Sequence, residues 1–444
     1  MNIQLSDHFD YPRLLRFVFP SVVMMVFTSI YSVVDGFFVS NYAGKTPYAA
    51  LNLIFPVLGI YGAVGFMIGT GGSAIVGRLL GEQRPEQANR CFSMMVEATV
   101  VSGAVLTLAA ILLMRPVSVF LKAEGEMLEY CVLYGDILSL ALVPFMLQNV
   151  FQSFLVTAER PKMGLWVTVA AGVTNIALDL LFVAVFRWGL AGAAAATALS
   201  QTVGGVVPLL YFLSGKNEIL HLSWVRPDWK VLWDTCTNGF SEVMSNISSA
   251  VVGILYNFQL IRLAGEDGVA AFGTIMYVNF FFLAISLGYS IGSSPIISYH
   301  YGAENYRELQ GLFKKSLILN GIIGVAMTAA SVLVARPLTG IFVGYDPVLF
   351  EMTVRGFLIY SLRYIFSGIV IFASGFFTAL GDGLTSAVIS FLRAIIFQVA
   401  MILILPELLG LDGIWLVGIT AETLAVLVAC FFFGAKRDQF HYIP

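Results

Sequence analysis

The amino-acid sequence predicts an all-α integral membrane protein, with twelve transmembrane helices in two six-helix lobes related by a parallel pseudo-two-fold repeat. The first observation is composition: 58% of the residues are hydrophobic and only 11% are charged, whereas soluble proteins are typically about 25% charged. The second is an internal repeat with an offset of 221 residues, nearly half of the 444-residue chain. The third is a series of long uncharged runs, since about 20 apolar residues are needed to cross a bilayer.

The repeat is carried mainly by glycines and loop residues, and it needs no gap. The matched segments are Ala43-Gly44 with Ala264-Gly265, Gly71 with Gly292, Gly81 with Gly302, Arg115-Pro116 with Arg336-Pro337, and Gly189-Leu190 with Gly410-Leu411. An apolar chain that repeats in this way is typical of transporters built from two related halves. Because each half holds six predicted spans, an even number, both halves enter the membrane in the same direction and the repeat is parallel.

Glycine, proline and charged residues divide the apolar runs into twelve predicted spans. These spans cover roughly 14–41, 48–80, 87–114, 126–157, 162–186, 189–214, 231–262, 269–301, 308–335, 348–380, 383–406 and 412–435. The polar stretch Ser214–Trp229 is the longest connection, and it separates the two halves. We therefore divide the chain into an N-lobe at 1–215, a cytoplasmic linker at 216–230 and a C-lobe at 231–444.

The distribution of Lys and Arg predicts that both termini face the cytoplasm. In that orientation 15 basic residues lie on the cytoplasmic side and 7 on the other, in agreement with the positive-inside rule. The first dozen residues contain Asp7, His8 and Asp10 but no basic stretch, so we expect no cleaved signal peptide. We expect a monomeric, multi-pass protein of the plasma membrane, which in bacteria is the inner membrane. The net charge of −3 does not indicate nucleic-acid binding.

Two pairs of polar residues in the predicted N-lobe form the first candidate site. Asp35 follows Tyr31 by four residues, and Asp179 follows Asn175 by the same spacing, so the members of each pair share one helix face. Carboxylates within a membrane are costly and usually functional, and hard oxygens suit Na⁺. The pattern predicts a site for a proton or for Na⁺ at Asp35, Asn175 and Asp179. The alternative is that each Asp only hydrogen-bonds to a neighbouring helix or reaches water.

The predicted C-lobe contains a different set of charges, namely Glu242, Arg363, Arg393 and Glu422. These four residues can neutralise one another, either as buried pairs that fix helix positions or as a gate or substrate contact. The charges do not follow the repeat, because Asp35 corresponds to Tyr256. The scaffold was duplicated, and its charges were not kept.

Proline, methionine and aromatic residues within the spans suggest a hinge and a cavity. Pro20 lies inside the first span, where the missing backbone N–H bends a helix. We expect a central cavity to be lined by Phe55, Met67, Phe151, Met276, Phe280 and Phe376, since apolar and polarizable side chains suit varied ligands. Packing against lipid is the alternative for each of these residues.

Several segments together carry a resemblance to a known family. In the first half they are YSVVDGFFV at 31–39, GRLLGE at 77–82 and VTNIALD at 173–179; in the second they are NGFSEVMSNISS at 238–249, YHYGAEN at 299–305, GFFTALGDG at 375–383 and ISFLRAI at 389–395. With these segments the chain resembles, over essentially its full length, the multidrug and toxic compound extrusion (MATE) family, in its MepA-like and DinF-like bacterial branch.

The resemblance implies a multidrug antiporter, in which a cationic or amphipathic organic compound leaves the cell while H⁺ or Na⁺ enters, with no other cofactor. In DinF-type relatives two Asp, an Asn and a Thr form an N-lobe cation site near Tyr residues. These positions fall on Asp35, Asp179, Asn175 and Thr197, with Tyr31 and Tyr134 adjacent. NorM-type relatives use acids deep in the C-lobe instead, but the comparable stretch of span 7 here is SSAVVG, and Glu242 lies earlier in that span.

Three other functions are weighed against this one. A lipid-linked oligosaccharide flippase of the same superfamily would need a basic cavity for phosphates, and only Arg363 and Arg393 are basic residues well inside spans. A membrane-embedded enzyme is disfavoured because the chain has four His, no HExxH, no CxxC pair and no Walker lysine. A channel would not require a lobe-to-lobe repeat.

Overall fold

The computed structural model describes residues 3–344 and 346–443, and the regular secondary structure of these residues is helical. The first half contains α1 (Tyr11–Phe38), the π-helical turn η1 (Val39–Ala43), α2 (Lys45–Gly81), α3 (Pro85–Phe120), α4 (Gly125–Leu140), α5 (Leu142–Thr157), α6 (Pro161–Asp179), the π-helical turn η2 (Leu180–Val185) and α7 (Gly189–Leu213). The second half contains α8 (Trp229–Gly302), α9 (Tyr306–Val343), α10 (Pro347–Ser361), α11 (Tyr364–Ala379), α12 (Gly383–Phe391), the π-helical turn η3 (Leu392–Ile396), α13 (Phe397–Leu409), α14 (Leu411–Ala435) and α15 (Arg437–Phe440).

The helices of residues 3–344 and 346–443 account for the twelve predicted spans. Nine segments there are long and apolar enough to cross a membrane, and two bent pairs, α4–α5 and α10–α11, pass the same test together. Helix α8 has 74 residues and would be about 110 Å long if it were straight. Its backbone is non-helical at Gly265, with φ 61° and ψ −144°, so it forms two spans. The lobe boundaries at 215 and 231 stay predictions; the segment between α7 and α8 is non-helical from Lys216 to Asp228.

Each of the two bent pairs corresponds to one predicted span, at 126–157 and at 348–380. The axes of α4 and α5 meet at 58°, and those of α10 and α11 at 44°. The first bend lies at Ala141 (φ −96°, ψ 11°), three residues before Pro144, which lacks the N–H that would continue the helical bonding. The second bend lies at Arg363 and involves no proline. It is accompanied by a tertiary ion pair, which is described below.

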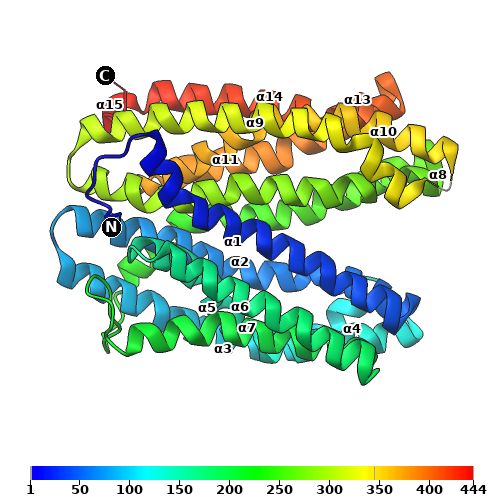
Figure 1. The fold of residues 1–444 in the computed structure, drawn as a ribbon, viewed down its shortest axis with the longest axis horizontal. Coiled ribbons are helices and arrows are strands. Elements are labelled where there is room, and N and C mark those ends of the chain that lie inside the picture. The colour runs from blue at the N-terminus through cyan, green and yellow to red at the C-terminus, as the bar shows by residue number, and fades with distance from the viewer. Residues whose placement is uncertain (1–2, 345, 444) are drawn as a thin grey trace.

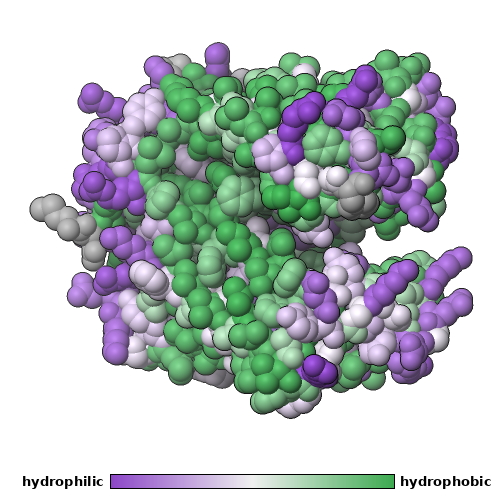
Figure 2. All heavy atoms as spheres, turned by 45° about the vertical axis from the view of Figure 1, so that its right-hand side comes forward, coloured by the Kyte–Doolittle hydropathy of each residue, from purple (hydrophilic) through white to green (hydrophobic). Residues whose placement is uncertain are grey.

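The two halves lie side by side along the long axis of the molecule, and both chain termini lie at the same end (Figure 1). We call this end the closed end and the opposite one the open end. The halves are in contact at the closed end, whereas a cleft separates them at the open end (Figure 2). Figure 2 also shows a broad hydrophobic band between hydrophilic ends, and large apolar side chains such as Phe120 and Leu333 are exposed. Such a band matches the hydrocarbon layer of a bilayer.

Glycines allow the helix backbones of the two halves to touch at the closed end. A Cβ atom on Gly81 of α2 would lie 2.0 Å from the carbonyl oxygen of Tyr299 in α8. A Cβ atom on Gly302 of α8 would lie 2.1 Å from the carbonyl oxygen of Arg78 in α2. Offsetting the first pair by 221 residues gives the second pair, so the contact obeys the pseudo-two-fold symmetry that the sequence predicts.

A second pair of symmetry-related contacts lies deeper in the same interface. Gly71 of α2 meets Gly239 of α8, where an added Cβ would lie 2.8 Å from the backbone nitrogen of Gly239. The equivalent contact joins Gly292 of α8 to Val18 of α1, with 2.9 Å between the added Cβ and Cγ1 of Val18. We call these four contacts between the halves the glycine seam. Small residues at such positions let membrane helices approach closely.

The turns of the scaffold follow the same repeat. Gly44 and Gly265 have φ values of 104° and 61°, and Gly189 and Gly410 have φ values of 60° and 59°. Positive φ favours glycine because it has no Cβ. The glycines found in the sequence repeat therefore mark equivalent turns in the two halves.

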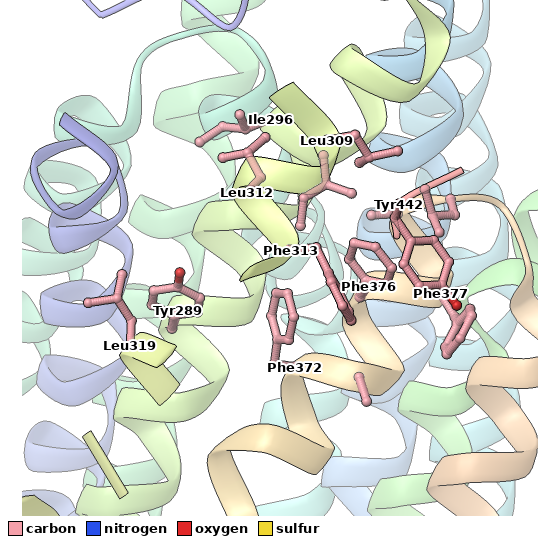
Figure 3. Close-up of a cluster of buried hydrophobic side chains, with 14 of the residues drawn as sticks. Tyr289, Ile296, Leu309, Leu312, Phe313, Leu319, Phe372, Phe376, Phe377 and Tyr442 are labelled. Atoms are coloured by element: carbon pink, nitrogen blue, oxygen red, sulfur yellow. The ribbon is translucent and has the colours of Figure 1, made fainter. Parts of the chain in front are cut away.

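An apolar core at the closed end joins both halves to the terminal segments. Phe313 of α9, Phe376 and Phe377 of α11, and Tyr442 near the C-terminus pack closely together (Figure 3). The Phe313 and Phe376 rings have centroids 5.0 Å apart, and the Tyr442 hydroxyl donates to the Phe433 carbonyl oxygen at 2.9 Å. Leu5, Phe9 and Phe17 of the first half belong to the same cluster. Packing thus reinforces the glycine seam.

We expect Gly81→Ala to destabilise the protein by about 1–3 kcal/mol, because the added methyl group overlaps backbone atoms that cannot move independently. The apparent melting temperature of the purified protein measures this effect. Gly321→Ala is the matched control, since nothing lies within 4 Å of an added Cβ there. An equal melting temperature for the two variants would contradict the assignment of Gly81 to the seam.

Candidate functional site

The first-half candidate residues come together where α1, α6 and α7 meet. The Asn175 amide nitrogen donates to the Thr197 hydroxyl at 3.4 Å, and that hydroxyl donates to Asp35 Oδ1 at 3.5 Å. Asp35 is 8% exposed, and Asp179 is 0% exposed. Three separate helices therefore supply one polar cluster, which we call the acid site.

The two carboxyl groups of the acid site lie on helices α1 and α6, which pack together, and they are close enough for their charges to interact. In the part of the chain that the structure describes, neither oxygen of Asp179 accepts a hydrogen bond, nor does Oδ1 of Asn175. An ionised carboxylate can only accept hydrogen bonds, and two such groups repel when buried together. The arrangement provides oxygen atoms without donors, which is the environment that binds a proton or a small cation.

Tyrosine residues border the acid site on two sides. Tyr134 of α4 is fully buried beside Asp35, Asp179 and Thr197. Tyr31 lies one turn before Asp35 on α1, and its ring packs edge-to-face on Phe27 with centroids 6.2 Å apart. The sequence analysis did not identify Gln148 of α5, which is 5% exposed and packs against Gly204 of α7. The available signal was a run of polar residues in α5, which also includes Asn149, Gln152 and Ser153.

The α6 backbone permits Tyr31 to approach because residue 172 is glycine. A Cβ atom on Gly172 would lie 2.8 Å from Cδ1 of Tyr31 and 2.4 Å from Cε1 of Phe27. The close contact of α1 with α6 positions the two carboxylates on facing helices. Gly172 thus contributes to the acid site although it carries no functional group.

The three π-helical turns of the described residues adjoin charged residues of the candidate sites. η1 begins four residues after Asp35, η2 begins directly after Asp179, and Arg393 lies within η3. A π-turn inserts one residue into the helix and often occurs at functional sites. These turns were not predicted, because the sequence around them has the same apolar pattern as an ordinary helix.

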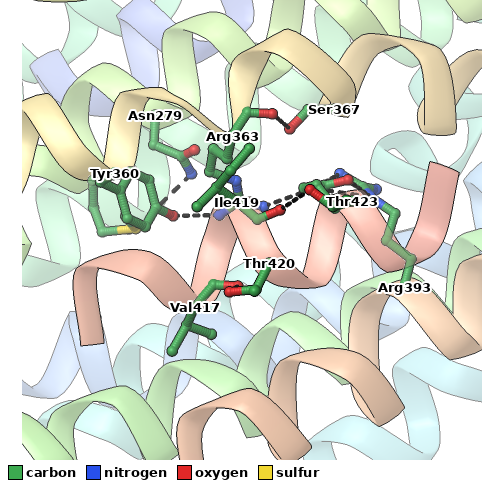
Figure 4. Close-up of polar contacts among 11 residues, drawn as sticks. Asn279, Tyr360, Arg363, Ser367, Arg393, Val417, Ile419, Thr420 and Thr423 are labelled. Carbon is green, nitrogen blue, oxygen red and sulfur yellow. Dashed lines mark hydrogen bonds and ion pairs between the residues drawn. The ribbon is translucent and has the colours of Figure 1, made fainter. Parts of the chain in front are cut away.

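The second-half charges converge on Glu422 of α14, which is 0% exposed (Figure 4). Arg393 of η3 donates from Nε to Oε2 at 2.9 Å and from Nη2 to Oε1 at 2.9 Å. Arg363, at the break between α10 and α11, donates from Nη2 to Oε1 at 3.0 Å. The side chains of Arg363 and Arg393 are 13% and 16% exposed. We call these three residues the arginine triad.

Aromatic hydroxyls complete the surroundings of the arginine triad. Arg363 donates to the Tyr360 hydroxyl, and its guanidinium lies 5.1 Å from the centre of that ring. Tyr256 stacks on Phe272 with ring centroids 4.7 Å apart, and Phe272 packs edge-to-face against Tyr360 at 6.4 Å. Among the described residues, the Tyr256 hydroxyl and the Arg363 Nε have no hydrogen-bond partner.

The structure separates Glu242 from the other three second-half charges with which the sequence analysis grouped it. In residues 3–344 and 346–443, no Lys, Arg or His lies within ion-pair distance of Glu242. It follows Gly239 of the glycine seam by three residues. The expectation that Glu242 helps to neutralise Arg363 and Arg393 is therefore wrong, because α8 carries it towards the closed end.

The expected cavity residues occupy several different environments. Phe151 is fully buried and stacks on Phe212 with centroids 5.6 Å apart, and Phe376 is fully buried in the core of Figure 3. Both are core residues, so their assignment to a cavity wall is corrected. The backbone of Met67 lies at the glycine seam, against Gly239.

Three expected cavity residues, Met276, Phe280 and Phe55, lie beside the surroundings of the arginine triad or are exposed. Asn279, which Figure 4 shows beside Tyr360, donates to the sulfur of Met276 at 3.9 Å. Phe280 follows Asn279 in α8 and is 54% exposed, as is Phe55 of α2. Pro20 lies buried inside α1, whose helix continues across it, and its role as a hinge stays a prediction.

A family model described as MatE matches residues 20–181 and, a second time, residues 243–404. The two matched segments fall one in each half, and each includes residues of one candidate site. Asp35, Asn175 and Asp179 lie in the first segment, and Arg363 and Arg393 lie in the second.

Similar proteins and structures cover almost the whole chain. The chain is 23% identical to multidrug export protein MepA of Staphylococcus saprophyticus over 433 residues, which are 96% of this chain and 94% of the relative. It is 21% identical to MepA of Staphylococcus aureus over 430 residues, 97% of this chain and 94% of the relative. A crystal structure of MATE in complex with MaL6 matches with a TM-score of 0.92 and 21% identity, covering 96% of both chains.

We expect Asp179→Asn to raise the apparent melting temperature of the purified protein in a buffer of neutral pH without Na⁺. The amide removes one of two facing buried acids and can donate a hydrogen bond to Asp35. The surface variant Glu129→Gln, whose side chain is 63% exposed, serves as the control and should leave the melting temperature unchanged. A lower melting temperature for Asp179→Asn would contradict this prediction, because it would show that the surrounding protein already stabilises both carboxylates.

Proposed function

Because the chain belongs to the MatE family, we propose that it is a secondary transporter that exports small organic, mainly cationic compounds in exchange for H⁺ or Na⁺. The names of the relatives, multidrug export proteins matched over nearly their full length, support export of varied compounds. The observation that carries the proposal is the acid site, in which two facing carboxylates are buried without a donor to Asp179.

The acid site supplies the coupling step. A bound proton bridges Asp35 and Asp179, or a Na⁺ ion accepts oxygen ligands from both carboxylates, Asn175 Oδ1 and Thr197. When the cation leaves, the two buried acids repel each other, and that repulsion favours a different packing of α1 against α6. Tyr31 and Tyr134 add hydroxyl groups at the border of the site, and a bend at Pro20 lets α1 respond.

The two halves provide alternating access to the space between them. In the conformation described above, the glycine seam keeps the halves together at the closed end, while the cleft is accessible at the open end (Figure 2). With both termini in the cytoplasm of a bacterium, this conformation faces outward across the inner membrane. Rocking of the halves about the pseudo-two-fold axis opens the other side.

The driving force is sufficient for export. One pH unit supplies about 1.4 kcal/mol per proton, and 100 mV supplies about 2.3 kcal/mol for each net charge moved. A hundredfold concentration ratio requires about 2.7 kcal/mol, so one or two cations suffice. The exchange works only if the cation and the organic compound each bind the two conformations with different affinities.

Efflux from proteoliposomes tests the proposal. The transported probe is the methyl ester of a carboxyl-bearing rhodamine, a fluorescent organic cation, and a pH gradient and a Na⁺ gradient are imposed separately. We expect the wild type to transport the probe under one of the two gradients. Asp35→Asn and Asp179→Asn should abolish gradient-driven transport while retaining binding of the probe, because the amide cannot exchange the cation.

Asp136→Asn is the matched control, since it changes an acid of α4 that lies outside the acid site, and its transport should match the wild type. Transport by Asp35→Asn at the wild-type rate would show that the coupling site lies elsewhere. A protein that is inert under both gradients but moves lipid-linked oligosaccharides would be a flippase.

A further inference from the structure

The arginine triad has a net positive charge in the middle of the membrane-spanning region. Two guanidinium groups share the single carboxylate of Glu422, and no other Asp or Glu of the described residues forms an ion pair with either arginine. Glu422 lies eleven residues after the start of α14 and thirteen before its end, which places it near the centre of the span. An excess positive charge at that depth is costly, so it requires a reason beyond holding helices together.

The arginine triad occupies the position in the second half that the acid site occupies in the first. Tyr256, which lies in the same buried cluster as the Arg363 partner Tyr360, is the repeat equivalent of Asp35. Gly418, equivalent to Thr197, lies under Arg363, where an added Cβ would be 3.1 Å from Cδ of that side chain. The same pocket of the duplicated scaffold therefore carries two negative groups in one half and an excess positive group in the other.

The surroundings of the triad offer hydrogen bonds that no described residue uses. The Tyr256 hydroxyl is buried, with 2% of the residue exposed, and has no partner, and neither does Arg363 Nε. Arginine and phenol groups both donate to carboxylates, and a planar guanidinium binds a carboxylate through two parallel bonds. The side chains of both arginines are partly exposed, at 13% and 16%, whereas Glu422 is 0% exposed.

We propose that Arg363 and Arg393, with Tyr256 in the adjoining aromatic cluster, form a binding site for the carboxylate of an exported organic compound. Glu422 occupies part of this site when it is empty, because it is the internal carboxylate that the two guanidinium groups share. A substrate carboxylate either binds beside Glu422 and neutralises the excess positive charge, or displaces Glu422 from one arginine. The inference rests on the proposed export function for its biological meaning, and it concerns a site separate from the acid site.

A charge series tests the proposal with two matched probes. One is the carboxyl-bearing rhodamine, a zwitterion, and the other is its methyl ester, which has the same aromatic cation without the carboxylate. Binding is measured by fluorescence anisotropy with the purified full-length protein in lipid nanodiscs. The readout is the ratio of the two dissociation constants within each variant, so that a general loss of folded protein affects both probes alike.

We expect the preference for the carboxyl-bearing probe over its methyl ester to increase about tenfold in Glu422→Gln, because two guanidinium groups are left without a carboxylate. The same preference should decrease about tenfold in Arg393→Gln, because the remaining Arg363–Glu422 pair is neutral. A tenfold change corresponds to ~1.4 kcal/mol. Arg393→Gln keeps the Arg363–Glu422 pair and so creates no unpaired buried charge. Arg262→Gln removes the same charge from an exposed pair with Glu407, and its ratio should equal that of the wild type.

An unchanged ratio across Glu422→Gln, wild type and Arg393→Gln would overturn the proposal and leave the triad as a helix-fixing ion pair. The result is independent of the transport assay. If the wild type fails to move the methyl ester under either gradient, the proposed function fails, whereas the binding ratio still reports on the arginine triad.

Discussion

Backbone contact between the two halves at the glycine seam constrains the rest of the structure. Gly71 and Gly81 of α2 and Gly302 of α8 face main-chain atoms of the other half at distances that leave no room for a Cβ. Gly292 of α8 faces the side chain of Val18 in the same way. Because these contacts lie at the closed end, the halves diverge from there towards the open end (Figures 1 and 2). Burial of Phe9 and Tyr442 in the adjoining core adds apolar stabilisation. The cleft and both candidate sites depend on this one-sided contact, since a seam along the full length would leave no space between the halves.

The scaffold is symmetric, whereas its electrostatics are not. The equivalent seam contacts, and the equivalent turns at Gly44 and Gly265, show that both halves use the same backbone. Yet the first half places facing carboxylates at Asp35 and Asp179, and the second places two arginines around Glu422. Opposite polarities in equivalent pockets would let one molecule hold a coupling cation in one half and an anionic group of the cargo in the other. The shared backbone moves both pockets together.

The sequence predicted the elements that depend on local chemistry. The helical spans follow from apolar runs, the turn at Gly265 follows from the repeat, and the meeting of Asp35 with Asn175 and Thr197 follows from spacing together with family resemblance. Features that depend on packing were missed. The bend at Arg363 is accompanied by its ion pair with the distant Glu422, and the close approach of Tyr31 to Gly172 joins α1 to α6. Glu242 was grouped with the arginines because sequence gives its sign of charge but not its height in the bundle.

Distances between spin labels test most directly whether the halves rock about the seam in response to the coupling cation. One pair of labelled cysteines replaces Glu124 and Asp267, which are exposed at the open end. A second pair replaces Glu86 and Glu304, which are exposed at the closed end. The distance within each pair is measured by double electron–electron resonance in lipid nanodiscs. Changing the proton or Na⁺ concentration should shorten one distance while it lengthens the other, and Asp179→Asn should not respond. Two distances that stay constant, or that change in the same direction, would contradict the account.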